Sequence, residues 1–270
     1  MNIVVCIKQV PDTTEIKIDP VKNTLIRTGV PSIMNPFDKN ALETGLQLKD
    51  RYGGKVTVIS MGPPQAKAVL REALAMGADE AYLVTDRAFG GSDTYATSYI
   101  LSQAIQMLGG FDVILGGKQA IDGDTAQVGP QIAEKLGIPQ VTYVKNFELQ
   151  DQSAIVERSL EDGYEKLKVK LPCVLTAIKE LNVPRYMSVR GILRAAKTEV
   201  KVWNAADIGV DVETVGLKAS PTNVFKSFTP KPKGVGVKIE GDTPKEKAAN
   251  LLIALKEKHI ILEEKSNEGF

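Results

Sequence analysis

From residue 1 to about residue 120, short β-branched apolar runs alternate with longer segments of helical periodicity, and this alternation constrains the fold most strongly. A helix between two strands crosses back over the sheet, so the next strand joins parallel to the first. The sequence therefore predicts an α/β protein with an open, mostly parallel sheet and helices on both faces. Strands are expected at residues 3–7, 56–60, 81–84 and 111–115, and helices at 38–51, 63–77, 93–108 and 124–136.

Two parts of the chain depart from this pattern. Residues 14–28 resemble a polar hairpin, and alternating runs separated by polar turns predict antiparallel strands at 143–149, 153–160 and 165–177. Residues 179–200 look irregular and basic, and the tail beyond Trp203 is rich in lysine, glycine and proline, apart from a helix expected near 244–257. Such a tail is either disordered or laid over another subunit. We expect an α/β domain over residues 1–200 and a C-terminal arm over 201–270.

Composition excludes several classes of function. A formal net charge of +1 provides no field that would attract nucleic acid or an anionic membrane surface. Cys6 and Cys173 both lie in apolar runs and no apolar run reaches 18 residues, so we expect a cytoplasmic protein without disulfides or a membrane span. His259 is the only histidine, which disfavours a metal site and acyl-transfer catalysis.

Residues 111–131 carry the strongest functional signal in the chain. An apolar strand ends at Gly116-Gly117, and a polar turn leads to a helix start in which Asp124 can cap and Gln127 stands three residues later. A helix N-terminus favours phosphate, and Gly123 and Gly129 would let a ligand approach the backbone. An ordinary strand-to-helix crossover explains the pattern equally well, because neither the dinucleotide fingerprint nor the P-loop spacing is present.

The charged residues of this segment also have two interpretations. Lys118 either neutralises a phosphate or decorates the loop, whereas cap and turn roles suit Asp122 and Asp124 better than proton transfer. Phe89 to Thr94 form a second loop that enters a helix, either as a plain capped start or as a lid over a ligand. Since the sequence shows no set of side chains typical of a catalytic site, a bound cofactor would have to perform any demanding reaction.

A sequence signature lies in residues 156–176. It comprises Arg158, then Glu161-Asp162-Gly163, Glu165, and Pro172 leading into an apolar pair and Thr176, and it resembles the signature of electron-transfer flavoprotein β subunits. Four more segments resemble the same family: 34–37, 73–79, 117–122 and 181–186. The resemblance covers residues 1 to about 200 closely and the tail more loosely, and the last dozen residues carry no motif that can be assigned.

The resemblance implies a Rossmann-like, adenine-nucleotide-binding fold and a heterodimer with an α subunit that carries an electron-transferring FAD. In many members the β subunit holds AMP. A second group, which this chain resembles more at residues 86–94 and 122–130, holds a second FAD that accepts hydride from NADH. That group bifurcates electrons to ferredoxin or flavodoxin and, through the α-subunit FAD, to an acyl-CoA dehydrogenase. A non-redox nucleotide-binding module is the third possibility, and it would purify colourless.

If FAD is bound here, its diphosphate is expected at the helix start, with adenine near Cys6, Asn35 and Met61 and the isoalloxazine at the loop 89–94. The small residues of that loop leave room for the ring. The full set of expected cofactor-binding residues is Cys6, Asn35, Ser60, Met61, Gly62, Phe89, Gly90, Asp93, Thr94, Gly117, Lys118, Asp122, Gly123, Asp124, Thr125, Ala126, Gln127, Val128 and Gly129. By resemblance, residues 181–197 dock the dehydrogenase, with Leu193 as the apolar anchor and Arg190 and Arg194 at the rim.

Overall fold

The computed structural model describes residues 1–12, 31–225 and 234–261. The chain divides into two compact units, Met1–Ser227 and Phe228–Phe270, which are described separately. The hairpin expected over residues 14–28 lies outside the described residues.

The first unit is built on a nine-stranded sheet with the order β11-β5-β4-β1-β6-β10-β7-β8-β9. The strands from β11 to β7 run parallel to their neighbours, and β8 and β9 continue the sheet antiparallel. The strands are β1 (Asn2–Cys6), β4 (Lys55–Met61), β5 (Glu80–Val84), β6 (Val113–Gly117), β7 (Gln140–Gln150), β8 (Ser153–Ser159), β9 (Tyr164–Lys170), β10 (Cys173–Ala177) and β11 (Val200–Trp203). A separate two-stranded antiparallel sheet joins β2 (Gln9–Pro11) to β3 (Ser32–Met34). The predicted mostly parallel α/β fold is confirmed.

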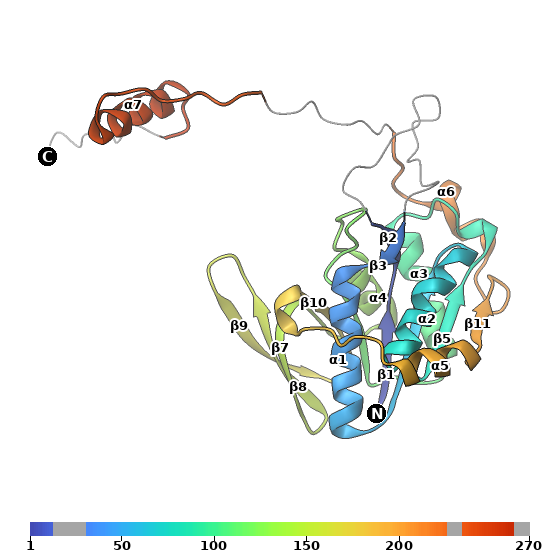
Figure 1. Ribbon diagram of the computed structural model, residues 1–270. Helices are drawn as coiled ribbons and strands as arrows, with labels where there is room; N and C mark the ends of the chain where they lie inside the picture. Colours follow the sequence, from blue (N-terminus) through green and yellow to red (C-terminus); the bar gives the residue numbers. More distant parts are fainter. Residues whose placement is uncertain (13–30, 226–233, 262–270) are drawn as a thin grey trace, which may run out of the picture. The chain divides into compact units, whose positions relative to one another are not determined.

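Helices cover both faces of the sheet (Figure 1). One face packs under α1 (Pro36–Tyr52), α2 (Lys67–Met76) and α5 (Val189–Lys197), and the other under α3 (Thr94–Met107) and α4 (Val128–Leu136). Alternate strand residues serve the two cores: Val5 and Val58 face the first, whereas Val4 and Ile59 face the second. Both cores are apolar, which is why the central strands read as continuous runs of valine, isoleucine and leucine.

The segment 179–200 is more regular than expected. Residues 189–197 form α5, which lies on α2, and a Cβ on Gly191 would run into the carbonyl oxygen of Ala75. The chain then adds β11 at the sheet edge beside β5. Because Val200 and Ala205 are buried, the first unit extends to Ser227 rather than ending near residue 200.

The run 165–177 is two strands rather than one. It breaks at Leu171-Pro172, where proline cannot donate to a strand ladder. The antiparallel prediction holds for β7, β8 and β9, but β10 is inserted parallel between β6 and β7. This insertion places the carboxyl end of β10 next to that of β6.

Strand β7 bends sharply near its middle. Tyr143 has a left-handed backbone (φ 55°), and the pairing register of β7 shifts on both of its edges near this point. The bend lets Phe147 and Leu149 pack against the core under α1. The antiparallel part of the sheet therefore lies along α1 instead of continuing in the direction of β10.

The second unit contains α7 (Pro244–Glu257). Its start has a capping box, in which the Thr243 side chain accepts from the Glu246 amide and the Glu246 carboxylate accepts from the Thr243 amide. No residue of this helix is buried, and Leu251, Leu252 and Ile253 are exposed. Among the described residues of both units, no helix is long and apolar enough to cross a membrane.

Candidate functional site

The strand order reverses beside β1. The chain builds β4 and then β5 on one side of β1 and afterwards crosses to its other side to form β6. In open α/β sheets such a reversal leaves a crevice at the carboxyl ends of the two strands, where ligands bind. We call the side of the sheet where the parallel strands end the carboxyl edge, and the side where they begin the amino edge.

Asp38 bridges the two strands that border this crevice. Its Oδ2 accepts from the amide of Lys8, just beyond β1, at 2.7 Å, and its Oδ1 accepts from the amide of Gly117, at the end of β6, at 3.0 Å. Burial raises the pKa of the Asp38 carboxyl to about 7, although hydrogen bonds from Asn35, Lys8 and Gly117 work in the opposite direction. One buried carboxyl group thus holds the carboxyl ends of β1 and β6 together.

Asn35 and Lys8 fasten the loop that follows β6. The Asn35 amide nitrogen donates to the Gln119 carbonyl at 2.8 Å, and the Asn35 oxygen accepts from the Ile121 amide at 3.2 Å. The Lys8 ammonium pairs with Asp122 at 2.7 Å, across the crevice. Asn35 is fully buried, so these contacts replace bonds that its amide would otherwise make with water. The loop is held in one place by residues that precede it by more than 80 positions.

Helix α4 starts later than predicted. It begins at Val128 after Gln127, and Asp124 is not its cap; the Asp124 carboxylate accepts from the Gln119 side chain instead. The reason is Pro130: a helix from residue 124 would place its ring in the helix interior against the carbonyl of Ala126, whereas a start at Val128 puts it in the first turn. Thr125 and Ala126 therefore belong to the loop and not to the helix.

The loop offers a different way to bind an anion. The backbone is left-handed at Asp124 (φ 50°) and Ala126 (φ 54°) and right-handed at Gln127 (φ −105°, ψ −30°). Alternating handedness turns successive N–H groups toward one concavity, which is the geometry of anion-binding nests, but the Asp124 amide itself donates to the Ala120 carbonyl at 2.9 Å. Thr125 is exposed, and the amides of Val128 and Gly129 are free because they open a helix.

Two buried polar atoms near the carboxyl edge find no hydrogen-bond partner among the described residues. They are the Ser60 hydroxyl at the end of β4 and the Gln131 side-chain oxygen in α4. Gln131 also meets Thr94, whose hydroxyl donates to Gln127 at 3.0 Å, so the N-termini of α3 and α4 lie together. Unsatisfied buried polar atoms are costly and need an explanation, and a bound polar ligand supplies one. The two atoms are therefore candidate contacts for a polar ligand at this edge.

The loop glycines have three different surroundings. A Cβ on Gly117 would lie 2.6 Å from the Cβ of Phe37, so this glycine lets β6 end against the start of α1. A Cβ on Gly129 would lie 2.6 Å from the Thr176 methyl group, so Gly129 serves helix packing on β10. Nothing lies within 4 Å of a Cβ on Gly123. Of the three, Gly123 is the position open to solvent and to a ligand.

The loop 89–94 is not the open cradle that its small residues suggested. The amide of Leu217 donates to the Gly90 carbonyl, and a Cβ on Gly91 would lie 2.9 Å from the Leu217 Cβ. Phe89 is buried in the core under α3. The loop 89–94 thus packs at Gly90 and Gly91 against α6 (Gly216–Ala219), which sequence periodicity had not predicted.

The start of α3 is also covered. Asp93 caps the helix, as expected, by accepting from the Ala96 amide, and it accepts from the amide and hydroxyl of Thr222 as well. Burial works to raise the pKa of the Asp93 carboxyl, but these hydrogen bonds outweigh it and hold the pKa below its usual value. The Asp93 carboxylate therefore joins Thr222, in the C-terminal part of the first unit, to the start of α3. The neighbouring Thr94 hydroxyl faces α4 instead, where it contacts Gln127 and Gln131.

Two of the residues expected near adenine, Cys6 and Met61, end neighbouring strands on the same face of the sheet. Cys6 and Met61 end β1 and β4 on the face under α3, and Gly62 follows directly, with its amide donating to the Val84 carbonyl. Burial, and secondly the charge of Asp38, raise the pKa of the Cys6 thiol to about 12. Cys6 therefore stays a thiol and serves as apolar wall rather than as a nucleophile.

The expected docking residues lie on α5 and differ in their contacts. Leu193 is 62% exposed and Arg190 is exposed as well. Arg194, in contrast, donates to the carbonyl oxygens of Leu74 and Ala78 at 2.9 and 3.0 Å. It therefore caps the carboxyl end of α2 while its side chain stays exposed at the surface of α5.

Sequence reasoning missed Asp38, which holds the crevice. A signal was available, because Asp38 stands three and four residues before Ala41 and Leu42 and therefore lies on the apolar face of α1. A carboxylate on an apolar stripe requires dedicated partners.

A mostly parallel sheet with a polar, loop-closed crevice at its switch point defines the class of doubly wound α/β proteins. Comparison with protein families matches residues 22–208 to the electron transfer flavoprotein domain. The chain belongs to the electron transfer flavoprotein family.

Similar proteins cover nearly the whole chain. The electron transfer flavoprotein subunit beta of Clostridium acetobutylicum is 62% identical over 261 residues, which are 97% of this chain and all of that protein. The caffeyl-CoA reductase-Etf complex subunit CarD of Acetobacterium woodii is 58% identical over 262 residues, again 97% of this chain and all of that one. Protein FixA of Azotobacter vinelandii is 47% identical over 274 residues, or 98% of each chain.

Proposed function

We propose that this protein is the β subunit of a cytoplasmic, heterodimeric electron-transfer flavoprotein that holds FAD at its carboxyl edge and takes part in electron bifurcation. The observation that carries the proposal is the loop 117–127, fastened into the switch-point crevice by Asn35, Asp38 and Lys8. When bound there, FAD would accept a hydride from NADH and pass one electron toward ferredoxin or flavodoxin and one, through the α-subunit FAD, toward an acyl-CoA dehydrogenase.

The chain's own residues have defined tasks in this proposal. The alternating backbone at residues 124–127 and the free amides at the start of α4 receive the diphosphate, and Lys118 adds a positive charge. The Ser60 hydroxyl and the Gln131 oxygen bind polar groups of the nucleotide, because both are buried without another partner among the described residues. Cys6 and Met61 form the apolar wall beside the adenine.

Quantitation of FAD and AMP in the purified heterodimer tests the proposal. Two FAD per heterodimer are expected, and one FAD with one AMP would replace the bifurcating assignment by the ordinary electron shuttle. Gly123→Glu adds a negative charge beside the phosphate loop without a steric clash, so it should lower the nucleotide content of this subunit. Gly163→Glu, equally open but on the turn between β8 and β9, is the matched control and should leave the content unchanged.

A second candidate is the shuttle that holds structural AMP in this subunit. It is favoured by the packing of α6 on the loop 89–94, where the small residues were expected to leave room for an isoalloxazine. Both candidates need the same phosphate loop and adenine wall, so only the nucleotide count separates them.

The proposed partners follow from the relatives and from exposed apolar residues. The names of two relatives place them with reductases of CoA thioesters, caffeyl-CoA reductase and acryloyl-CoA reductase, which supports an acyl-CoA dehydrogenase as the partner here. Leu193 on α5 is the proposed anchor. Leu193→Ala should slow electron transfer to the dehydrogenase and leave the nucleotide content intact, and an unchanged rate would remove this assignment.

The C-terminal arm is proposed to pack on the α subunit. Helix α7 has a complete N-terminal cap but buries none of its residues within the described part of the second unit, so its apolar side chains lack a core there. Hydrogen exchange should show α7 protected in the heterodimer and unprotected in the isolated chain. Equal protection in both would contradict the assignment.

A further inference from the structure

Lys118 is held in an unusual way for a lysine at a polar edge. Its ammonium lies 4.8 Å from the centre of the Phe37 ring and 6.0 Å from the centre of the Tyr143 ring. The neighbouring acids have other partners, since Asp122 pairs with Lys8 and Asp124 accepts from Gln119. In the described part of the chain, Lys118 has no carboxylate within ion-pair distance. Aromatic faces attract a cation without neutralising it, so the positive charge of Lys118 is kept.

Tyr143 reaches this position in a backbone conformation that tyrosine disfavours. Its φ of 55° is left-handed, a region in which glycine carries no penalty and a bulky side chain does. Tyr143 lies where the pairing register of β7 shifts, and a glycine would adopt this conformation more easily. The ring itself is about one third exposed, so core packing alone does not explain the tyrosine. A disfavoured residue that persists next to a binding edge points to function.

We propose that Phe37 and Tyr143 form an aromatic clamp that orients Lys118 toward an anionic phosphate group of the nucleotide bound at the carboxyl edge. The inference rests on the proposed nucleotide site, but it holds for FAD and AMP alike because both carry phosphate. Tyr143 is the positioning residue: it acts on the nucleotide only through Lys118, and strain in its backbone accompanies that role.

The experiment measures how fast the purified heterodimer loses its adenine nucleotide during repeated ultrafiltration, with FAD and AMP quantified in each fraction. Lys118→Met and Tyr143→Leu should each release the β-subunit nucleotide about fivefold faster at low salt, with a smaller difference at high salt. Tyr143→Phe keeps an aromatic face and should behave as wild type. The double variant Lys118→Met with Tyr143→Leu should release no faster than Lys118→Met alone, because both remove the same contact.

The variant Tyr143→Gly distinguishes a role of Tyr143 in the clamp from a role of Tyr143 in the stability of the fold. It removes the backbone strain, so it should unfold at a higher urea concentration than wild type and yet lose its nucleotide as fast as Tyr143→Leu. Faster loss that appears only in variants of lowered stability would overturn the clamp, as would additive effects in the double variant or an unchanged rate in Lys118→Met. Failure of the proposed FAD site is distinguishable, because the wild-type nucleotide count alone reports it.

Discussion

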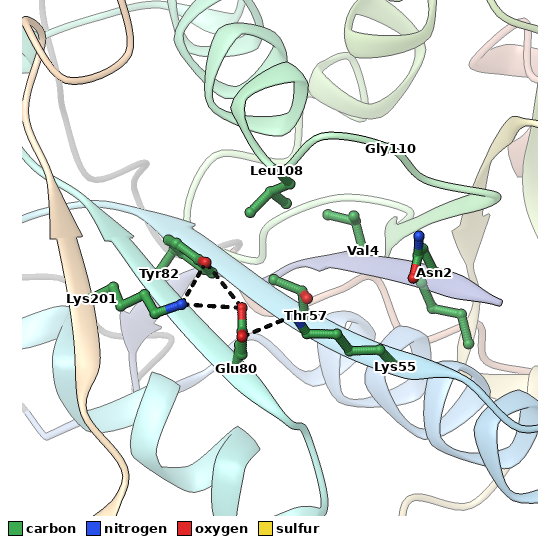
Figure 2. A pocket seen from close by; sticks show the side chains of 10 residues that line it. Asn2, Val4, Lys55, Thr57, Glu80, Tyr82, Leu108, Gly110 and Lys201 are labelled. Atoms are coloured by element: carbon green, nitrogen blue, oxygen red, sulfur yellow. Dashed lines mark hydrogen bonds and ion pairs between the residues drawn. The ribbon is translucent and has the colours of Figure 1, made fainter.

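The carboxyl edge and the amino edge of the same sheet contrast in how their polar groups are used. At the amino edge a cavity of about 250 Å³ is lined by Lys55, Glu80, Tyr82 and Lys201. These four are joined to one another: Glu80 pairs with Lys55 at 2.9 Å and Lys201 at 3.3 Å, and the Tyr82 hydroxyl donates to Glu80 and accepts from Lys201 (Figure 2). At the carboxyl edge, buried Ser60 and Gln131 keep polar atoms without a partner among the described residues.

The two edges differ in how completely their polar groups are bonded among the described residues, and the cavity at the amino edge does not mark the edge with unbonded groups. The amino-edge cluster has made its bonds within the chain, and it fastens β11 and β5 together. The carboxyl-edge residues Asp38 and Asn35 use their bonds to shape a loop, which then presents free amides and two unsatisfied side chains. A polar group that is already hydrogen-bonded gains little free energy from bonding a ligand. A buried group without a partner gains the full free energy of the new hydrogen bond.

The largest expected effect tests whether Asp38 is the buried bridge of the carboxyl edge. Its pKa is raised to about 7 in the folded protein, so between about pH 4 and pH 7 the unfolded chain releases this proton and the folded chain keeps it. The contribution of Asp38 to the free energy of unfolding should therefore fall as pH rises through this window, by on the order of 4 kcal/mol. Urea unfolding of wild type and Asp38→Asn at several pH values checks this, because asparagine does not titrate.

The stability advantage of wild type over Asp38→Asn should be greatest near pH 4 and shrink toward pH 7. Asp162→Asn, on an exposed turn, is the control. A constant difference between wild type and Asp38→Asn would mean that the carboxyl does not titrate in this range.

The second effect concerns the close approach of β6 to α1. Gly117→Ala places a Cβ 2.6 Å from the Phe37 Cβ and should destabilise the protein by about 1–3 kcal/mol, because the start of α1 must move. Gly123→Ala in the same loop meets nothing within 4 Å and is the matched control. Chemical unfolding measures both, and equal stability of the two variants would show that the contact relaxes at no cost.

The third effect sharpens the contrast between paired and unpaired hydroxyls. Ser60→Ala removes a buried hydroxyl without a partner, so it should leave stability nearly unchanged but weaken nucleotide retention about fivefold, the value of roughly one hydrogen bond. Ser102→Ala removes a buried hydroxyl that donates to the Tyr99 carbonyl and should leave retention alone. Nucleotide release during ultrafiltration gives both numbers. Equal nucleotide release from the two variants would contradict a special role of the unpaired Ser60 hydroxyl.

The smallest effect is expected at the amino edge. Glu80→Gln removes the centre of the cluster and should cost about 0.5–1 kcal/mol of stability, since its two lysine partners are about half exposed to water. The pKa of Glu80 is lowered mainly by Lys55, so this contribution is present at neutral pH and lost as the carboxylate protonates in acid. Nucleotide content should not change. Thermal unfolding and nucleotide analysis test the two statements, and lost nucleotide would show that the edges are coupled.

Much of this molecule follows from local sequence pattern. Four parallel strands, β1, β4, β5 and β6, and the helices α1 to α3 were predicted because their apolar periodicities are strong and uninterrupted. The start of α4 was predicted too early because Asp124 resembles a helix cap, and the constraint from Pro130 was not applied. The run 165–177 was predicted as one strand because the alternating pattern continues through Pro172. Both errors underrated proline, which acts through a missing donor and a bulky ring rather than through hydrophobicity.

The local structure around residues 117–127 was predicted, but its long-range contacts were not. A strand, a polar loop and a helix were expected there, and β6, the loop and α4 follow in that order. The bond from Gly117 to Asp38, the covering of the loop 89–94 by α6 and the capping of α2 by Arg194 all join residues more than 75 positions apart. Contacts between such distant residues produce no periodic pattern in the sequence, so they are seen only in the folded structure.

The addition of β11 has a consequence for the order in which the protein folds. This outermost strand pairs with β5, which precedes it by more than 115 residues. Strand β5 therefore lacks one of its two neighbours until residue 203 has left the ribosome. A strand edge that waits for a distant segment is slow to close and exposed to wrong pairing in the meantime. Trp203, the single tryptophan of the chain, stacks on Tyr82 with ring centres 4.2 Å apart, so its fluorescence reports the moment of closure.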